Sequence, residues 1–181
     1  MILGTDKLLE LLQSGLIEGL DENELNIEGC GVDLRIGELL EMDGGGGFLH
    51  KNERKTPNYK NVAAYEKDKK QIIVIEPGKY YVGKTVETIN TPENLFGLFI
   101  PRGTFYASGI LIHFGRVDPG YKGNFRFHLS NITNAPFEIE MGARIANMIF
   151  LRVDGRTHAY KGQWQGGRAF ITEKETQTKQ A

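Results

Sequence analysis

The sequence predicts an all-β protein, a distorted β-barrel or jelly roll with one short helix at its N-terminus. Glycine supplies 23 of 181 residues and aromatic residues make up 10%, a mixture typical of short strands joined by tight turns. From residue 71 onward, short apolar and β-branched segments alternate with turn residues, and no long helical period appears. We expect one domain over residues 1–171 and a loose polar tail over residues 172–181.

The N-terminal segment predicts the helix. Leu8, Leu11 and Leu12 recur at helical spacing. Thr5 is placed to cap this helix, and Gly15 is placed to end it.

The next segments predict a strand and then an exposed excursion. Residues 31–40, GVDLRIGELL, alternate apolar and charged side chains, so we expect a half-buried strand with Asp33 and Arg35 on one face. Residues 44–47 are all glycine, and residues 50–70 are highly charged and poor in apolar side chains. We expect residues 44–70 to be exposed and mobile.

The remaining strands follow in close succession, with turns at Pro77-Gly78 and at residues 118–121. Along residues 124–131, NFRFHLSN, two sets of side chains alternate and must face opposite sides of the strand. The apolar set is Phe125, Phe127 and Leu129, and the polar set is Arg126, His128 and Ser130. Residues 144–153, RIANMIFLRV, are apolar on both faces, which predicts a central strand.

Composition excludes several classes of function. Lys and Arg number 22 against 23 Asp and Glu, for a net charge of -1, which disfavours a nucleic-acid or anionic-membrane partner. The single Cys30 rules out an internal disulfide framework or a cysteine zinc cluster. No segment approaches the ~20 apolar residues that span a bilayer. We therefore expect a cytoplasmic protein.

Familiar catalytic motifs are missing as well. The sequence contains no Walker loop, no dinucleotide fingerprint and no nucleophile elbow. Its four histidines show no paired ligand spacing.

Polar residues instead punctuate the strands at four places. Taken alone, these could be ordinary turn and strand-end residues. In order along the chain they are GVDLRIG at 31–37, PRGT at 101–104, SGILIHFGRVDPGYKGNFRFHLSN at 108–131 and PFEIEMGARIANMIF at 136–150. Together they resemble the superfamily of deoxyuridine triphosphatases and deoxycytidine triphosphate deaminases. The opening helix and GVDLRIG resemble the deaminase branch in particular.

The resemblance implies a barrel-like protomer, usually a homotrimer, with sites for a pyrimidine deoxynucleoside triphosphate between subunits. Mg²⁺ and basic side chains would hold the triphosphate, and the backbone of a hairpin would read the base. Arginine forks suit phosphate oxygens, and glycine allows backbone N–H groups to approach an anion. The implied substrate-binding residues are Arg102, Gly103, Thr104, Tyr121, Arg144, Asn147 and Arg168.

Some of these assignments have alternatives or departures. Tyr121 is placed to present its ring to the deoxyribose, or it is a core or turn aromatic. Asn147 replaces a glutamine that is usual in the superfamily. The C-terminal segment containing Arg168 and Phe170 is similar to the superfamily's closing segment, without its usual glycine spacing.

The reaction depends on two positions. His128 stands where the deaminase branch has its proton-shuttling glutamate, and three further deaminase positions hold Gly103, Thr104 and Ala107. Asp118 matches the aspartate with which the hydrolase branch activates water.

The first hypothesis is therefore hydrolysis of dUTP to dUMP and pyrophosphate, with Asp118 as the base. The second is dCTP deamination with His128 as the proton shuttle. The third is a non-catalytic nucleotide-binding protein, and in the simplest case Asp118 is only a turn residue.

Overall fold

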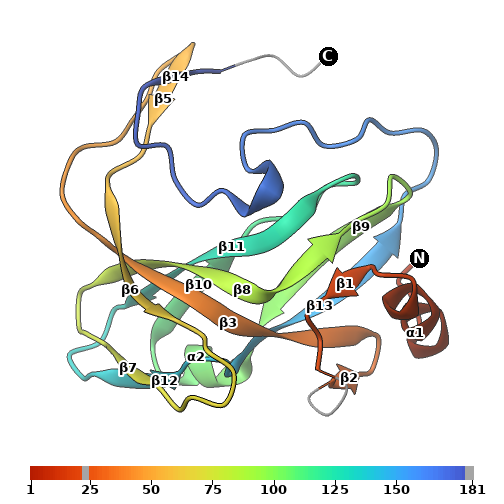
Figure 1. The fold of residues 1–181 in the computed structure, drawn as a ribbon, viewed down its shortest axis with the longest axis horizontal. Helices are drawn as coiled ribbons and strands as arrows, with labels where there is room; N and C mark the ends of the chain where they lie inside the picture. The colour runs from red at the N-terminus through yellow and green to blue at the C-terminus, as the bar shows by residue number, and fades with distance from the viewer. Residues whose placement is uncertain (22–24, 178–181) are drawn as a thin grey trace.

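The core of the fold is one curled sheet. The computed structural model describes residues 1–21 and 25–177, and the path through the main sheet runs β10-β11-β8-β3-β13-β9 (Figure 1). Its strands are β1 (Ile17–Glu18), β2 (Ile27–Glu28), β3 (Gly31–Met42), β6 (Tyr59–Ala64), β8 (Tyr80–Asn90), β9 (Leu95–Pro101), β10 (Ile110–Phe114), β11 (Lys122–Asn131) and β13 (Arg144–Arg152). The two end strands of this path, β10 and β9, approach each other. Phe99 of β9 stacks on Phe114 of β10 with ring centroids 4.9 Å apart. The predicted barrel-like all-β fold is confirmed.

Smaller elements surround this sheet. β7 (Ile72–Ile75) pairs with β12 (Phe137–Glu140), and β4 (Phe48–Leu49), β5 (Glu53–Lys55) and β14 (Glu175–Thr176) form a three-stranded sheet. The helices are α1 (Thr5–Gln13), α2 (Gly103–Ala107) and the 3₁₀ turn η1 (Gln165–Gly167). Among the described residues, none of the helices is long and apolar enough to cross a membrane.

The N-terminal helix α1 forms where the sequence predicts it. Leu8 is fully buried against the core. The helix ends in a Schellman motif, in which Gly15 has φ +87° and the N–H of Leu16 donates to the carbonyl of Leu11 at 3.0 Å. The predicted Thr5 cap is wrong: Gly4 is the N-cap, and the Thr5 hydroxyl donates to the carbonyl of Gly29.

Strand β3 is buried on both faces, so the expected half-buried strand is wrong. Segments packed on the sheet cover its polar face: Arg35 Nη2 donates to the carbonyl of Gly19 at 2.8 Å, and Arg35 Cζ lies 5.5 Å from the centroid of the Tyr65 ring. Arg35 is compensated there by Glu87 of β8, whose carboxylate accepts from Arg35 Nε at 2.6 Å and from the Arg35 N–H at 2.9 Å. Burial raises the pKa of Glu87, and the contacts with Arg35 oppose that shift.

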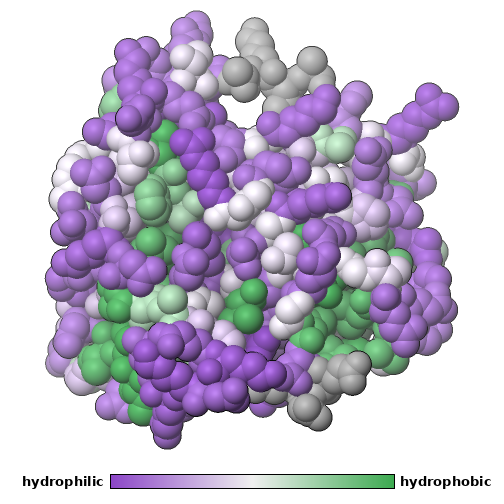
Figure 2. Space-filling model, viewed as in Figure 1, coloured by the Kyte–Doolittle hydropathy of each residue, from purple (hydrophilic) through white to green (hydrophobic). Residues whose placement is uncertain are grey.

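The charged excursion is structured in part. Residues 48–49, 53–55 and 59–64 form β4, β5 and β6, and β6 pairs with β3. The expected loose tail also forms a strand as far as Thr176, where Glu175 in β14 pairs with β5 and accepts from Arg54 Nη2 at 2.7 Å. The tail's last residues, 178–181, lie outside the described residues. Figure 2 shows a mainly hydrophilic face with separate apolar areas.

The remaining strand predictions hold. β13 pairs with β3 on one side and β9 on the other, as expected for a central strand. On β11, Phe125, Phe127 and Leu129 enter the core while the polar set faces the other way. The turn before β11 has the N–H of Tyr121 donating to the carbonyl of Asp118 at 3.1 Å, with Gly120 at φ +80°.

Candidate functional site

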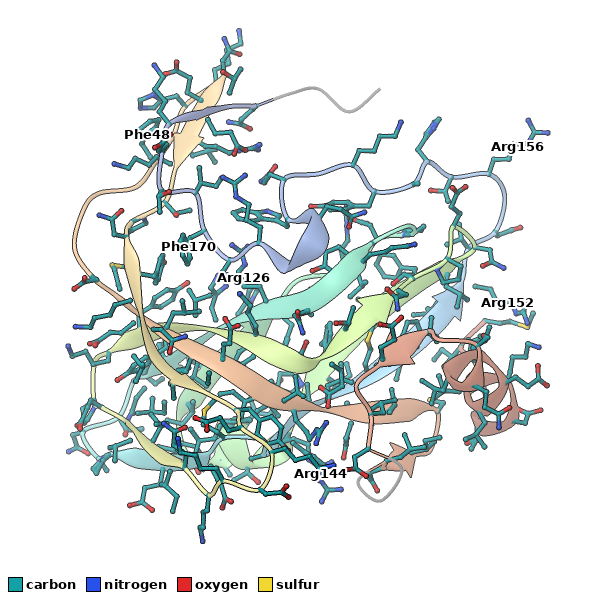
Figure 3. All side chains as sticks on the ribbon, viewed as in Figure 1. Phe48, Arg126, Arg144, Arg152, Arg156 and Phe170 are labelled. Atoms are coloured by element: carbon teal, nitrogen blue, oxygen red, sulfur yellow. The ribbon has the colours of Figure 1, made fainter. Side chains whose placement is uncertain are left out.

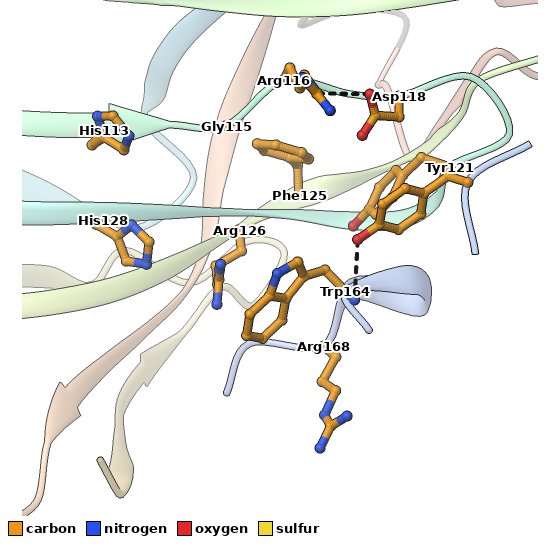
Figure 4. Close-up of a pocket in the computed structure, with 11 residues that line it drawn as sticks. His113, Gly115, Arg116, Asp118, Tyr121, Phe125, Arg126, His128, Trp164 and Arg168 are labelled. Carbon is orange, nitrogen blue, oxygen red and sulfur yellow. Dashed lines mark hydrogen bonds and ion pairs between the residues drawn. The ribbon is translucent and has the colours of Figure 1, made fainter. Parts of the chain in front are cut away.

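A cavity of about 290 Å³ lies along the polar face of β11, beneath the C-terminal segment (Figure 4). It brings together four of the predicted site residues: Asp118, Tyr121, His128 and Arg168. Its other lining residues are His113, Gly115, Arg116, Phe125, Arg126, Tyr160 and Trp164. We call it the β11 cavity.

Asp118 supplies the carboxylate of the β11 cavity. It sits in the turn between β10 and β11, and its side chain is 28% exposed. Oδ1 of Asp118 accepts from Arg116 Nε at 2.8 Å. Sequence reasoning missed Arg116, although its position two residues before Asp118 in an extended segment places both on one face. The cavity therefore holds a solvent-accessible, charge-paired carboxylate.

Tyr121 lies inside the same cavity. Its ring is buried beside Phe125, and its hydroxyl donates to the carbonyl of Asn124 at 2.8 Å. Burial raises the pKa of Tyr121 to about 12, so its hydroxyl stays protonated at neutral pH. The ring thus serves both the core and the wall of the cavity.

His128 and Arg126 occupy the polar face of β11 further along the cavity. The His128 ring stacks on Tyr80 with centroids 5.7 Å apart and faces His113 across the strand pair at 6.5 Å. Burial, followed by the charges of Arg126 and His113, lowers the pKa of His128 to about 4. The imidazole is therefore neutral at pH 7.

The C-terminal segment forms the cover of the cavity. Arg126 lies over the ring of Trp164, with Cζ 3.8 Å from the ring centroid. Arg126 Nη1 donates to the carbonyl of Ala169 at 2.7 Å. The segment approaches β11 so closely that a β-carbon on Gly123, at φ +138°, would overlap the backbone of Gly167. These contacts attach the cover to the strand.

Arg168 has partners within this cover. Its guanidinium pairs with Glu175 at 2.5 Å, and its Nε donates to the carbonyl of Phe170 at 3.1 Å. Phe170 stacks on Tyr59 with centroids 5.6 Å apart.

A second group of predicted residues gathers around Asp33, whose side chain is fully buried. Asp33 Oδ2 accepts from Arg102 Nη1 at 2.9 Å, and Oδ1 accepts from Asn147 Nδ2 at 3.0 Å. Arg144 Nη1 lies 3.6 Å from Oδ2, and Asn26 Nδ2 donates to the same oxygen at 2.7 Å. We call this group the Asp33 cluster.

The Asp33 cluster borders a cavity of about 460 Å³ that Arg102, Thr104 and Arg144 help to line. Gly103 is exposed and begins α2. The side chains of Arg102 and Arg144 are 35% and 49% exposed, so one buried carboxylate holds two arginines that also reach solvent. Sequence reasoning did not assign Asp33 a role, although the register that pairs it with Asn147 decides the cluster.

The two groups lie apart on the protomer. The two cavities have no lining residue in common. Figure 3 shows Arg126 below the C-terminal segment and Arg144 at the opposite edge of the barrel. One chain therefore places the carboxylate and the aromatic rings on one side and the arginine pair on another.

The model of the "dCTP deaminase-like" family matches residues 2–153. The chain belongs to this family. A probable deoxyuridine 5'-triphosphate nucleotidohydrolase of Methanopyrus kandleri is 30% identical over 154 residues, which are 85% of this chain and 93% of the relative. A dCTP deaminase of Pyrococcus horikoshii is 30% identical over 160 residues, 88% and 90% of the two chains.

A solved structure supports the fold of this family member. The 2'-deoxycytidine 5'-triphosphate deaminase of Agrobacterium tumefaciens superposes with a TM-score of 0.64 at 17% identity, covering 84% of this chain and 46% of that one. The relatives of this chain thus include proteins named as deoxyuridine triphosphate hydrolases and proteins named as dCTP deaminases.

Proposed function

We propose that the protein hydrolyses dUTP to dUMP and pyrophosphate. The observation that carries the proposal is the partly exposed Asp118 carboxylate in the same cavity as Tyr121 and the polar face of β11. An ionised carboxylate at a cavity wall can deprotonate water, and a neighbouring aromatic ring can support a sugar.

In the proposed mechanism, Asp118 accepts a proton from a water molecule as its oxygen attacks the α-phosphorus. The bond between that phosphorus and the α–β bridging oxygen breaks, and pyrophosphate leaves with the bond's electron pair. Arg102 and Arg144 bind phosphate oxygens and stabilise the charge that develops on them. Positioning and charge stabilisation supply most of the rate enhancement.

Mg²⁺ fits this scheme as an ion carried by the triphosphate. Both oxygens of Asp33 already accept hydrogen bonds, and its neighbours are arginines and amides, a donor set suited to phosphate rather than to a cation. Mg²⁺ commonly binds substrate phosphates and keeps several waters. When bound, it neutralises phosphate charge, and the phosphate oxygens would hold it.

The separation of the two groups supports an oligomer in which subunits share each site. Leu98 and Ile100 on β9 are exposed, at 36% and 51%, and Ile100 pairs with Asn147 of the Asp33 cluster. A second copy seated on this apolar surface would therefore lie beside the Asp33 cluster. We propose a homotrimer, and sedimentation of a 20 kDa species at micromolar concentration would refute it.

One assay separates the three hypotheses. The protein is incubated with dUTP or dCTP and Mg²⁺, and pyrophosphate and ammonia are measured in parallel. Pyrophosphate from dUTP supports hydrolysis, ammonia from dCTP supports deamination, and neither product supports a binding protein. Deamination is the second candidate because His128 occupies the cavity, but the low pKa of His128 makes it a weak base.

Asp118→Asn tests the catalytic carboxylate. The turn depends on the backbone carbonyl of Asp118, so an asparagine keeps it. Pyrophosphate release should fall by roughly 10²–10⁴-fold with little change in melting temperature. Asp43→Asn is the matched control, because Asp43 is an exposed carboxylate 3.7 Å from Lys60 and lines neither cavity. Hydrolysis by Asp118→Asn at the wild-type rate would make Asp118 a turn residue only.

A further inference from the structure

The proposed hydrolytic step uses neither Arg126 nor His128. Both residues nevertheless line the β11 cavity together with Asp118. They are two residues apart on β11 and therefore project from the same face of the strand. Figure 4 shows the two side chains next to each other, with Trp164 beyond Arg126. The cavity thus has a carboxylate at one end and an arginine–histidine pair at the other.

Aromatic contacts hold both Arg126 and His128 in the wall of the cavity. Trp164 covers one face of the Arg126 guanidinium, and the carbonyl of Ala169 accepts from Nη1. A guanidinium has five N–H donors, so this one hydrogen bond uses a fraction of them. Tyr80 stacks on the face of His128 at an interplanar angle of 21°. The remaining N–H groups of Arg126 and the ring nitrogens of His128 are the groups that a planar ligand in the cavity would meet.

We propose that Arg126 and His128 select a pyrimidine base with a 4-keto group over one with a 4-amino group, an inference that rests on the proposed function. A guanidinium can only donate hydrogen bonds, so it matches the O4 acceptor of uracil. A neutral imidazole can accept from the adjacent N3–H of uracil. Cytosine reverses both groups and would direct its 4-amino donor at Arg126.

This chemistry predicts strong discrimination between the two bases. A buried polar site rejects a ligand that leaves its groups unpaired much more strongly than an apolar pocket rejects a small change in size. Because the β11 cavity is partly open to solvent at Asp118, we expect a preference for dUTP of about 100-fold or more in kcat/KM.

The test measures kcat/KM for pyrophosphate release from dUTP and from dCTP in the wild type and in Arg126→Gln. A glutamine amide can both donate and accept, so it can pair with either base. The proposal expects the dUTP/dCTP ratio to fall at least about tenfold. An equal loss for both substrates would overturn it, because Arg126 would then bind phosphate or only hold the cover.

A control variant and a binding measurement separate base selection by Arg126 from its contact with the cover and from catalysis. Trp164→Leu removes the contact of the cover with Arg126 but retains the guanidinium, so it should lower both activities and preserve the ratio. Calorimetric binding of dUMP and dCMP to the wild type needs neither catalysis nor a folded variant. Equal affinities would overturn the proposed selection. Tighter binding of dUMP without pyrophosphate release from dUTP would support the selection and refute the hydrolase alone.

Discussion

Asp33→Asn should weaken both the fold and the binding of the triphosphate. The substitution keeps the shape of the side chain but removes the buried charge that holds Arg102 and Arg144. Removing one partner of a fully buried ion pair costs about 3–5 kcal/mol. Both arginine side chains are more than a third exposed, at 35% and 49%, and can be rehydrated, so we expect about 2–3 kcal/mol.

For a chain of 181 residues, this loss corresponds to a decrease of roughly 4–12 °C in melting temperature. The two arginines would no longer be fixed relative to one another, so KM for dUTP should rise about tenfold, with a smaller change in kcat. Thermal unfolding and steady-state pyrophosphate release measure the two effects. The control Asp43→Asn should change stability by less than about 1 kcal/mol. A wild-type melting temperature and KM in Asp33→Asn would refute the reasoning.

Three further predictions concern stability. Glu87→Gln removes the fully buried carboxylate that pairs with Arg35 Nε and should cost about 3–5 kcal/mol in denaturant unfolding; a cost below about 1 kcal/mol would contradict this. The folded-state pKa of His128, about 4, is below its ordinary value of 6.5, so unfolding takes up a proton between these values. Stability should therefore fall as pH drops from about 6.5 to 4, and comparison of melting curves for wild type and His128→Gln should show a shallower loss in the variant. Gly83→Ala places a methyl group inside the ring of the fully buried Phe127 and should cost about 1–3 kcal/mol, whereas an unchanged unfolding midpoint would show that the ring can move.

The local pattern of residues was sufficient to predict most strands and turns. Alternation along residues 124–131 placed Phe127 in the core and His128 on the opposite face, because side chains on a strand alternate whatever lies beside it. Gly15 and Gly120 marked a helix end and a turn, because each position has a positive φ that glycine adopts without strain. The fold class followed from such local rules.

Burial and the grouping of the site required the tertiary structure. Alternation along residues 31–40 suggested one solvent-exposed face, but both faces are buried. Only the neighbouring strands supply Glu87 to Arg35 and Asn147 to Asp33. Trp164 contacts Arg126 because the C-terminal segment folds back over β11, and no local sequence pattern predicts that contact. The sequence by itself determined which residue types stand on which strand face. Only the tertiary structure decided that Asp118 and the arginine pair lie apart on the protomer, because strand order and register depend on contacts between distant segments.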